Sequence, residues 1–243
     1  MSLWIKICAN TSLADAQLAA EAGADAVGFV FAPSPRRVTA EEVAEIVPHL
    51  PAALEKIGVF VDAAFEEIAA TVETAGLTGV QLHFDAPPAL PSQLRKRFGA
   101  KLRILGVVHF DARKIAGGTD FVSEHDIRYT ENSERTSGAL SPEGYFSDPN
   151  IDATLVDSHT AAAVGGTGQA YDWVLASKAL LQNTDRRKLF VAAGGLTPEN
   201  VGKAIATLRP WGVDVVSGVE AKPGRKDPAK VRGFIANARA ARM

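Results

Sequence analysis

Residues 154–173 read TLVDSHTAAAVGGTGQAYDW, and this stretch decides the fold class. A short apolar run ends at Asp157, and Gly165, Gly166 and Gly168 follow before a helical pattern begins. In parallel α/β enzymes, an acid at the carboxyl end of a strand and a glycine turn with open backbone N–H groups place a carboxylate beside a phosphate. The stretch therefore predicts chemistry on a phosphorylated small molecule, although a plain tight turn has the same composition.

The composition indicates one soluble globular unit. The chain has 243 residues, 47% of them hydrophobic, and α/β barrels of this length commonly form one domain. A formal net charge of -2 gives no electrostatic reason to expect nucleic acid or a membrane as partner. A single cysteine excludes an intrachain disulfide, and the start MSLWIKICANTS lacks the pattern of a secretory signal. No apolar run is long enough to span a bilayer, so we expect a cytoplasmic protein.

Short apolar runs alternate with alanine-rich amphipathic stretches along the chain, which is the rhythm of a βα repeat. Eight runs are predicted as strands buried on both faces, as in a parallel sheet: Trp4–Cys8, Ala26–Phe31, Lys56–Val61, Gly79–His83, Leu102–Val108, Ala153–Asp157, Leu189–Ala193 and Val213–Ser217. Eight strands predict a closed (β/α)8 TIM barrel. A doubly wound open sheet shares this rhythm, but it would more often carry a dinucleotide fingerprint after its first strand.

Two helix starts and one insertion are also predicted. Thr39-Ala-Glu-Glu42 forms a capping box, and Thr197-Pro198 is an N-cap followed by proline. Residues 109–152 are about twice as long as a usual connection, so we expect a single domain, 1–243, with an insertion there. Since this polar segment leaves the carboxyl end of a strand, it is either a lid or a peripheral extension.

The carboxyl ends of barrel strands form the active face. The predicted strand ends and loops place there Cys8, the Ser34–Arg37 loop, Gln81, His83, Asp157, Gly194-Gly195 and Ser217-Gly218. The first and sixth strands lie nearly across the barrel from one another. Cys8 and Asp157 therefore suit a base and an acid that act on opposite sides of one substrate.

Each of these residues also has a purely structural explanation. A lone cysteine is commonly a small buried hydrophobe, and Asp157 is at a position typical of helix caps. His83 is compatible with a core histidine, and Arg36 with a surface cation. Lys6 shares the face of the cysteine, so we expect a buried ion pair, with Asp214 as the candidate partner, rather than a catalytic lysine. The remaining histidines lack metal-site spacing, and we expect no metal.

Several motifs run along nearly the whole chain in a fixed order: Lys6–Ala9 (KICA), Gly28–Phe31 (GFVF) with Ser34–Val38 (SPRRV), Val80–Phe84 (VQLHF), Leu155–Asp157 (LVD) with Gly165–Trp173 (GGTGQAYDW), Ala193–Leu196 (AGGL) with Asn200-Val201, and Asp214–Asp227. As an ordered set they resemble the phosphoribosylanthranilate isomerase family, which consists of (β/α)8 barrels of tryptophan biosynthesis.

The resemblance implies an Amadori rearrangement of N-(5'-phosphoribosyl)anthranilate to 1-(2-carboxyphenylamino)-1-deoxyribulose 5-phosphate, without a cofactor. Cys8 would be the general base and Asp157 the general acid, while Arg36 would hold the anthranilate carboxylate. Gln81 and His83 would contact the substrate. The phosphate would be bound by the backbone around Gly166, Thr167, Gly168, Gly194, Gly195, Ser217 and Gly218. A cysteine near cations would ionise more readily than a free thiol.

Three positions depart from the family pattern. Ala9 and Phe84 replace glycines, and Val216 replaces a serine. Ala9 matters most if its backbone requires a positive φ, where a Cβ is costly. Two alternatives stay open: another phosphosugar barrel enzyme, such as indoleglycerol-phosphate synthase or a pentose-phosphate epimerase, and a non-catalytic barrel that binds a phosphorylated ligand.

Overall fold

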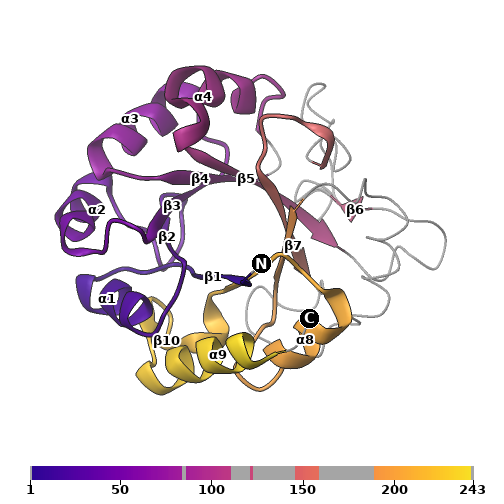
Figure 1. The fold of residues 1–243 in the computed structure, drawn as a ribbon. Coiled ribbons are helices and arrows are strands. Elements are labelled where there is room, and N and C mark those ends of the chain that lie inside the picture. The colour runs from indigo at the N-terminus through magenta and orange to yellow at the C-terminus, as the bar shows by residue number, and fades with distance from the viewer. Residues whose placement is uncertain (1, 84–85, 111–120, 123–145, 159–188, 242–243) are drawn as a thin grey trace, which may run out of the picture.

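The computed structural model describes residues 2–83, 86–110, 121–122, 146–158 and 189–241. Within them, eight parallel strands form a ring with helices on its outside (Figure 1). The strands are β1 (Trp4–Ile7), β2 (Ala26–Val30), β3 (Glu55–Phe60), β4 (Gly79–Leu82), β5 (Arg103–Phe110), β7 (Ala153–Ser158), β8 (Leu189–Ala193) and β9 (Gly212–Val215). Pairing of β4 with β5 and of β1 with β9 closes the ring, so the barrel is confirmed over the open sheet.

All eight predicted strands are present: Leu189–Ala193 has the predicted bounds, and the ends of the other seven differ from the prediction by at most two residues. The first ends at Ile7, but its ladder continues one step, because the Cys8 N–H donates to Val215 O at 2.9 Å. The prediction that the last strand reaches Ser217 is wrong. It ends at Val215, since Ser217–Val219 turn into the short 3-10 helix η4.

The described helices are α1 (Leu13–Glu21), α2 (Ala40–Ile46), α3 (Phe65–Ala75), α4 (Leu90–Phe98), α8 (Val201–Leu208) and α9 (Pro228–Ala240), with short 3-10 turns η1 (Val47–His49) and η2 (Gly99–Lys101). The capping box is confirmed: Thr39 Oγ1 accepts from Glu42 N at 3.2 Å, and Glu42 Oε2 accepts from Thr39 N at 2.8 Å. The prediction of Thr197 as an N-cap is wrong, because Asn200 Oδ1 accepts the Thr197 N–H and closes a turn before α8. None of the described helices combines the length and apolar character needed to cross a membrane.

Part of the predicted insertion extends the sheet. The two-residue strand β6 (Phe121–Val122) pairs antiparallel with the end of β5, His109 opposite Val122. Residues 111–120 and 123–145 lie outside the described residues, so the choice between a lid and a peripheral extension stays a prediction.

Strand alternation divides the core into two layers. Ile5 and Ile7 of β1 face the helices, whereas Trp4 faces the barrel interior. The interior cluster consists of Trp4, Ala26, Ile57, Leu105, Val107, Ala153, Leu155, Val191 and Ala193. Trp211 stacks on Trp4 with ring centroids 5.1 Å apart, and Arg103 lies 5.4 Å from the Trp211 ring while it pairs with Glu55 at 2.7 Å. We call these four residues, Trp4, Trp211, Arg103 and Glu55, the amino-end cluster.

Candidate active site

A buried ionic group occupies the barrel interior between the amino-end cluster and the carboxyl ends of the strands. Lys6 Nζ donates to Asp214 Oδ1 at 2.9 Å and to Gln81 Oε1 at 2.7 Å, and its side chain is fully buried. This confirms the ion pair predicted for Lys6 and Asp214. Gln81, predicted to contact substrate, is buried, and its carbonyl oxygen already accepts a hydrogen bond from Lys6. We call Lys6, Asp214 and Gln81 the lysine cluster.

Cys8 lies two residues beyond Lys6 on the same face of the chain and is 3% exposed. Burial raises the pKa of the Cys8 thiol, and the nearby Lys6 and Lys226 cations only partly offset this effect. The prediction that neighbouring cations would make this thiol ionise more readily than a free one is therefore wrong in its net direction. The cations are present, but desolvation of the thiolate outweighs them.

The backbone after Cys8 takes an unusual conformation. Ala9 has a φ of 59°, so it occupies the left-handed region that the glycine of the family pattern adopts without strain. Asn10, fully buried, anchors this turn: its Nδ2 donates to Ile7 O at 2.8 Å and to Gly28 O at 3.2 Å. Sequence reasoning missed Asn10, although a polar residue directly after a buried strand is a signal for such an anchor.

A second ionic group lies at the rim of the barrel. Arg36 makes a two-bond fork to Glu220, with Nε to Oε1 at 2.8 Å and Nη2 to Oε2 at 2.7 Å. Lys226 Nζ lies 3.6 Å from Glu220 Oε1, and the Gly224 N–H donates to the same oxygen at 3.1 Å. We call Arg36, Glu220 and Lys226 the rim cluster. Arg36 is thus held in place rather than an ordinary surface cation.

The charges of the rim cluster depend on one another. Burial by itself would raise the pKa of Glu220, but the hydrogen bond from Arg36 and the charge of Lys226 leave that pKa lowered. Burial also lowers the pKa of Lys226, and the negative charge of Glu220 offsets only part of this lowering. Glu220 is therefore an anion that fixes Arg36 while using two of the five N–H groups of the guanidinium.

A small hairpin brings Glu220 to this position. It consists of β10 (Glu220–Lys222) and β11 (Arg225–Lys226), which pair antiparallel after η4. Thr11 Oγ1, in the loop after β1, donates to Gly224 O at 2.5 Å and ties the hairpin to that loop. Sequence reasoning missed Glu220, although it lies within the Asp214–Asp227 motif.

Asp157 and His83 lie at the same end of the barrel. Asp157 is half-buried on β7, opposite Ala193 of β8, and β7 stands three strands away from β1 in the ring of eight. His83 directly follows β4, with its N–H donating to Phe60 O at 3.1 Å, and it is also half-buried. Both predicted side chains therefore start from strand ends that lie three strands away from β1, one on each side of the ring. Phe84 lies outside the described residues.

Two of the three predicted phosphate loops touch one another. Gly194 and Gly195 follow β8 with φ values of 81° and 60°. A Cβ at Gly218, in η4 after β9, would lie 1.8 Å from Leu196 O, so only glycine permits this approach between the two loops. Gly166, Thr167 and Gly168 lie outside the described residues.

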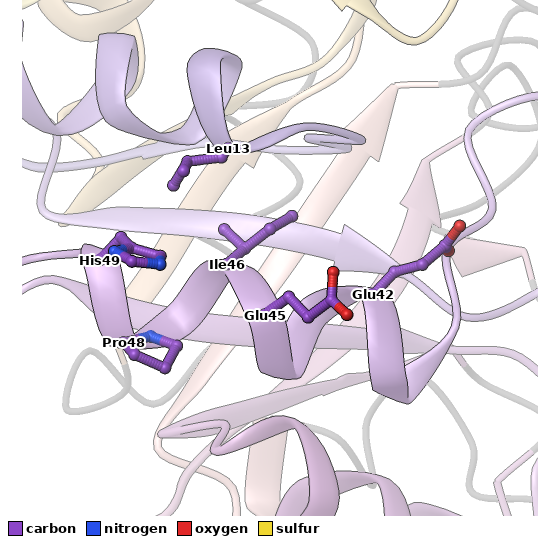
Figure 2. A pocket seen from close by; sticks show the side chains of 6 residues that line it. All are labelled: Leu13, Glu42, Glu45, Ile46, Pro48 and His49. Atoms are coloured by element: carbon purple, nitrogen blue, oxygen red, sulfur yellow. The ribbon is translucent and has the colours of Figure 1, made fainter.

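A hollow on the described surface lies away from the strand ends. A depression of about 690 Å³ between α1 and α2 is lined by Leu13, Glu42, Glu45, Ile46, Pro48 and His49 (Figure 2). None of these residues comes from a strand end, and two of them are acids. This surface is unsuited to an anionic substrate, so the chemistry of the strand ends, not this hollow, identifies the candidate site.

The closed barrel with its polar groups gathered at the carboxyl ends of the strands has the architecture of a (β/α)8-barrel enzyme. The sequence matches the model of the N-(5'phosphoribosyl)anthranilate (PRA) isomerase family over residues 5–123 and 137–237. The chain belongs to this family. The match passes over residues 124–136, which fall within the predicted insertion.

Individual relatives cover almost the whole chain. The N-(5'-phosphoribosyl)anthranilate isomerase of Citrifermentans bemidjiense is 38% identical over 236 residues, 97% of this chain and 96% of the relative. The crystal structure of phosphoribosyl anthranilate isomerase from Thermus thermophilus is similar with a TM-score of 0.75 and 30% identity, over 99% of this chain and all of that one. A phosphoribosyl anthranilate isomerase in complex with reduced 1-(o-carboxyphenylamino)-1-deoxyribulose 5-phosphate has a TM-score of 0.70 and 33% identity, over 97% and 98% of the two chains.

Proposed function

We propose that this chain rearranges N-(5'-phosphoribosyl)anthranilate to 1-(2-carboxyphenylamino)-1-deoxyribulose 5-phosphate in tryptophan biosynthesis, with Cys8 as the general base and Asp157 as the general acid. Family membership supports the reaction. The observation that carries the assignment of residues is their placement: the one cysteine of the chain and Asp157 stand at carboxyl strand ends on nearly opposite sides of the barrel. That separation suits two proton transfers at different atoms of one substrate.

The first step opens the ribose ring. Asp157, as a carboxylic acid, gives its proton to the ring oxygen, the bond between C1′ and that oxygen breaks, and the nitrogen lone pair forms a protonated Schiff base at C1′. The positive charge that results acidifies the proton on C2′. An acid on one side of the ring is therefore needed before a base on the other side can act.

The second step removes the C2′ proton. The Cys8 thiolate takes it, the electrons of that C–H bond form the C1′–C2′ double bond, and the Schiff-base nitrogen becomes neutral. The enol then becomes the ketone as its hydroxyl loses a proton and C1′ gains one. Burial raises the pKa of the Cys8 thiol. The thiolate is therefore a stronger base, but a smaller fraction of the thiol is ionised at neutral pH.

The two ends of the substrate are held by different groups. Arg36 faces the rim, where Glu220 fixes its guanidinium in one plane and leaves further N–H groups for the anthranilate carboxylate. The adjoining turns at Gly194-Gly195 and Ser217-Gly218 supply backbone groups for the phosphate. Substrate contacts of Gln81 and His83 remain part of the proposal.

The test is conversion of the substrate by the purified chain. Loss of N-(5'-phosphoribosyl)anthranilate and appearance of the deoxyribulose product, without added metal or cofactor, are expected. Binding of the substrate without conversion would instead support a non-catalytic barrel. Conversion of other phosphosugars, with none of this substrate, would support a different barrel enzyme.

A further inference from the structure

The side chain of Lys6 has one N–H donor beyond the two that bind Asp214 and Gln81. An ammonium group has three N–H donors. Two of them are engaged by Asp214 Oδ1 on β9 and by Gln81 Oε1 on β4, at 2.9 and 2.7 Å. Because the side chain of Lys6 is fully buried, its third N–H must find a partner within the barrel.

Cys8 lies where that partner is needed. A Cβ at Gly28 of β2 would lie 2.5 Å from Cys8 Sγ and 3.0 Å from Lys6 Cε, so both side chains pack against the same point of the neighbouring strand. Alternation along the chain puts Lys6 and Cys8 on the same face, with Cys8 nearer the carboxyl end. The sulfur and the ammonium group are thereby brought together beside a residue that has no side chain.

We propose that Lys6 is a positioning residue for Cys8: oriented by Asp214 and Gln81, it donates its third N–H to the Cys8 sulfur and holds the thiolate toward the substrate. The proposal rests on Cys8 being the base in the proposed function. Lys6 does not touch the reacting atoms, and the proton it donates stays on its nitrogen throughout. Buried ion pairs often add little net stability, so pairing with Asp214 does not by itself explain why a lysine is buried here. A role in positioning Cys8 gives this buried charge a function.

Four charged groups act on the Cys8 thiol in the described structure. Lys6 and Lys226 favour the thiolate, Asp214 opposes it, and the charge on Arg36 interacts favourably with it. Burial outweighs the cations and leaves the pKa of Cys8 raised. Removal of Lys6 should raise this pKa further. Since the base must be ionised, the rise of kcat with pH should then move to higher pH.

The test measures ionisation of Cys8 directly. Cys8 is the only cysteine in the chain, so the pH titration of thiolate ultraviolet absorbance, corrected with Cys8→Ala, reports this group alone. Lys6→Met should move the midpoint upward by about one pH unit, which corresponds to about a tenfold loss of thiolate below the midpoint. At neutral pH, kcat should fall about tenfold and recover at high pH, while KM changes little. An unchanged or lowered midpoint would overturn the proposal, even if the variant is less stable.

Two further variants keep the test decisive. If Lys6→Met leaves Asp214 unpaired and does not fold, Lys6→Met/Asp214→Leu removes both charges, a replacement that buried pairs often tolerate. Its midpoint is also expected above that of the wild type, because Lys6 affects Cys8 more than Asp214 does. Lys56→Met is the matched control: Lys56 is also buried, but its Nζ donates to Pro51 O, and its loss should leave the midpoint unchanged. A wild type that titrates as expected but converts no substrate would refute the proposed function and not the contact between Lys6 and Cys8.

Discussion

The two ends of this barrel use buried charge in different ways. At the amino end, the Trp4 and Trp211 rings stack, and the Arg103–Glu55 pair lies beside them with a quarter or so of each side chain exposed. At the carboxyl end, Lys6 and Lys226 are fully buried around a thiol. Burial of charge is costly even when the charge is paired, so packing alone does not explain the second arrangement. One end of the fold is organised for stability and the other for chemistry.

Substitution of the proposed acid should have the largest effect on turnover among the tests of this comparison. Asp157→Asn keeps the shape of the side chain but cannot donate a carboxylic proton, so kcat should fall at least about a hundredfold. The thermal midpoint should barely move. Steady-state kinetics and a melting curve on the same preparation measure both. Near-normal turnover in a folded variant would refute the assignment.

The next effect concerns binding at the rim. Arg36→Ala removes a charge-assisted contact worth about 1.5–3 kcal/mol, so KM should rise about tenfold to a hundredfold. Glu220→Gln is the companion variant, because it keeps Arg36 but weakens the fork that fixes it, and it should raise KM by a smaller factor. An unchanged KM in Arg36→Ala would place the anthranilate carboxylate elsewhere, with Arg37 as the next candidate.

The third effect is a gain in stability at the carboxyl end with little change in turnover. Ala9 has a φ of 59°, where a residue with a Cβ is strained by about 1–2 kcal/mol and glycine is not. Part of this gain is lost to the greater freedom of glycine in the unfolded chain, so Ala9→Gly should raise the free energy of unfolding by about 0.5–1 kcal/mol. Asp62→Gly, at a φ of 54°, is a matched control in which the gain should be smaller, since aspartate tolerates this region better. If denaturant unfolding shows that Ala9→Gly lowers the free energy of unfolding, Ala9 is not strained at its positive φ.

The smallest effect on turnover is expected at the amino end. Trp211→Ala removes the ring stacked on Trp4 and the surface beneath Arg103, and the free energy of unfolding should fall by about 2 kcal/mol or more. Turnover measured well below the unfolding transition should stay unchanged. A large fall in kcat without a loss of stability would show that the two ends are not separate in function.

Much of the fold and the inner part of the site could be predicted from local pattern. Runs of apolar residues located all eight strands, because strands of a parallel barrel are buried on both faces. Alternation placed Lys6 inside with Asp214, because residues two apart share a face and the two strands are neighbours in the ring. These features depend on periodicity along one strand at a time.

Other features depend on contacts that local pattern does not encode. Glu220 meets Arg36 across 184 residues of sequence, and only the hairpin after η4 brings them together. The direction of the Cys8 pKa shift was predicted wrongly, because sequence indicates both a buried thiol and neighbouring cations but not which of the two effects prevails. Thr197 was misplaced as an N-cap because Asn200 binds its N–H instead.

The central claim is that Cys8 is the base at the chemical end of the barrel, and the single-turnover rate of Cys8→Ala tests it most directly. With enzyme in excess of N-(5'-phosphoribosyl)anthranilate, the rate of product formation should fall at least about a hundredfold, because no other group replaces the thiolate. The free energy of unfolding, measured on the same sample, should change little, since a small sulfur atom is all that is removed. Product formation at a near-normal rate by folded Cys8→Ala would contradict the claim.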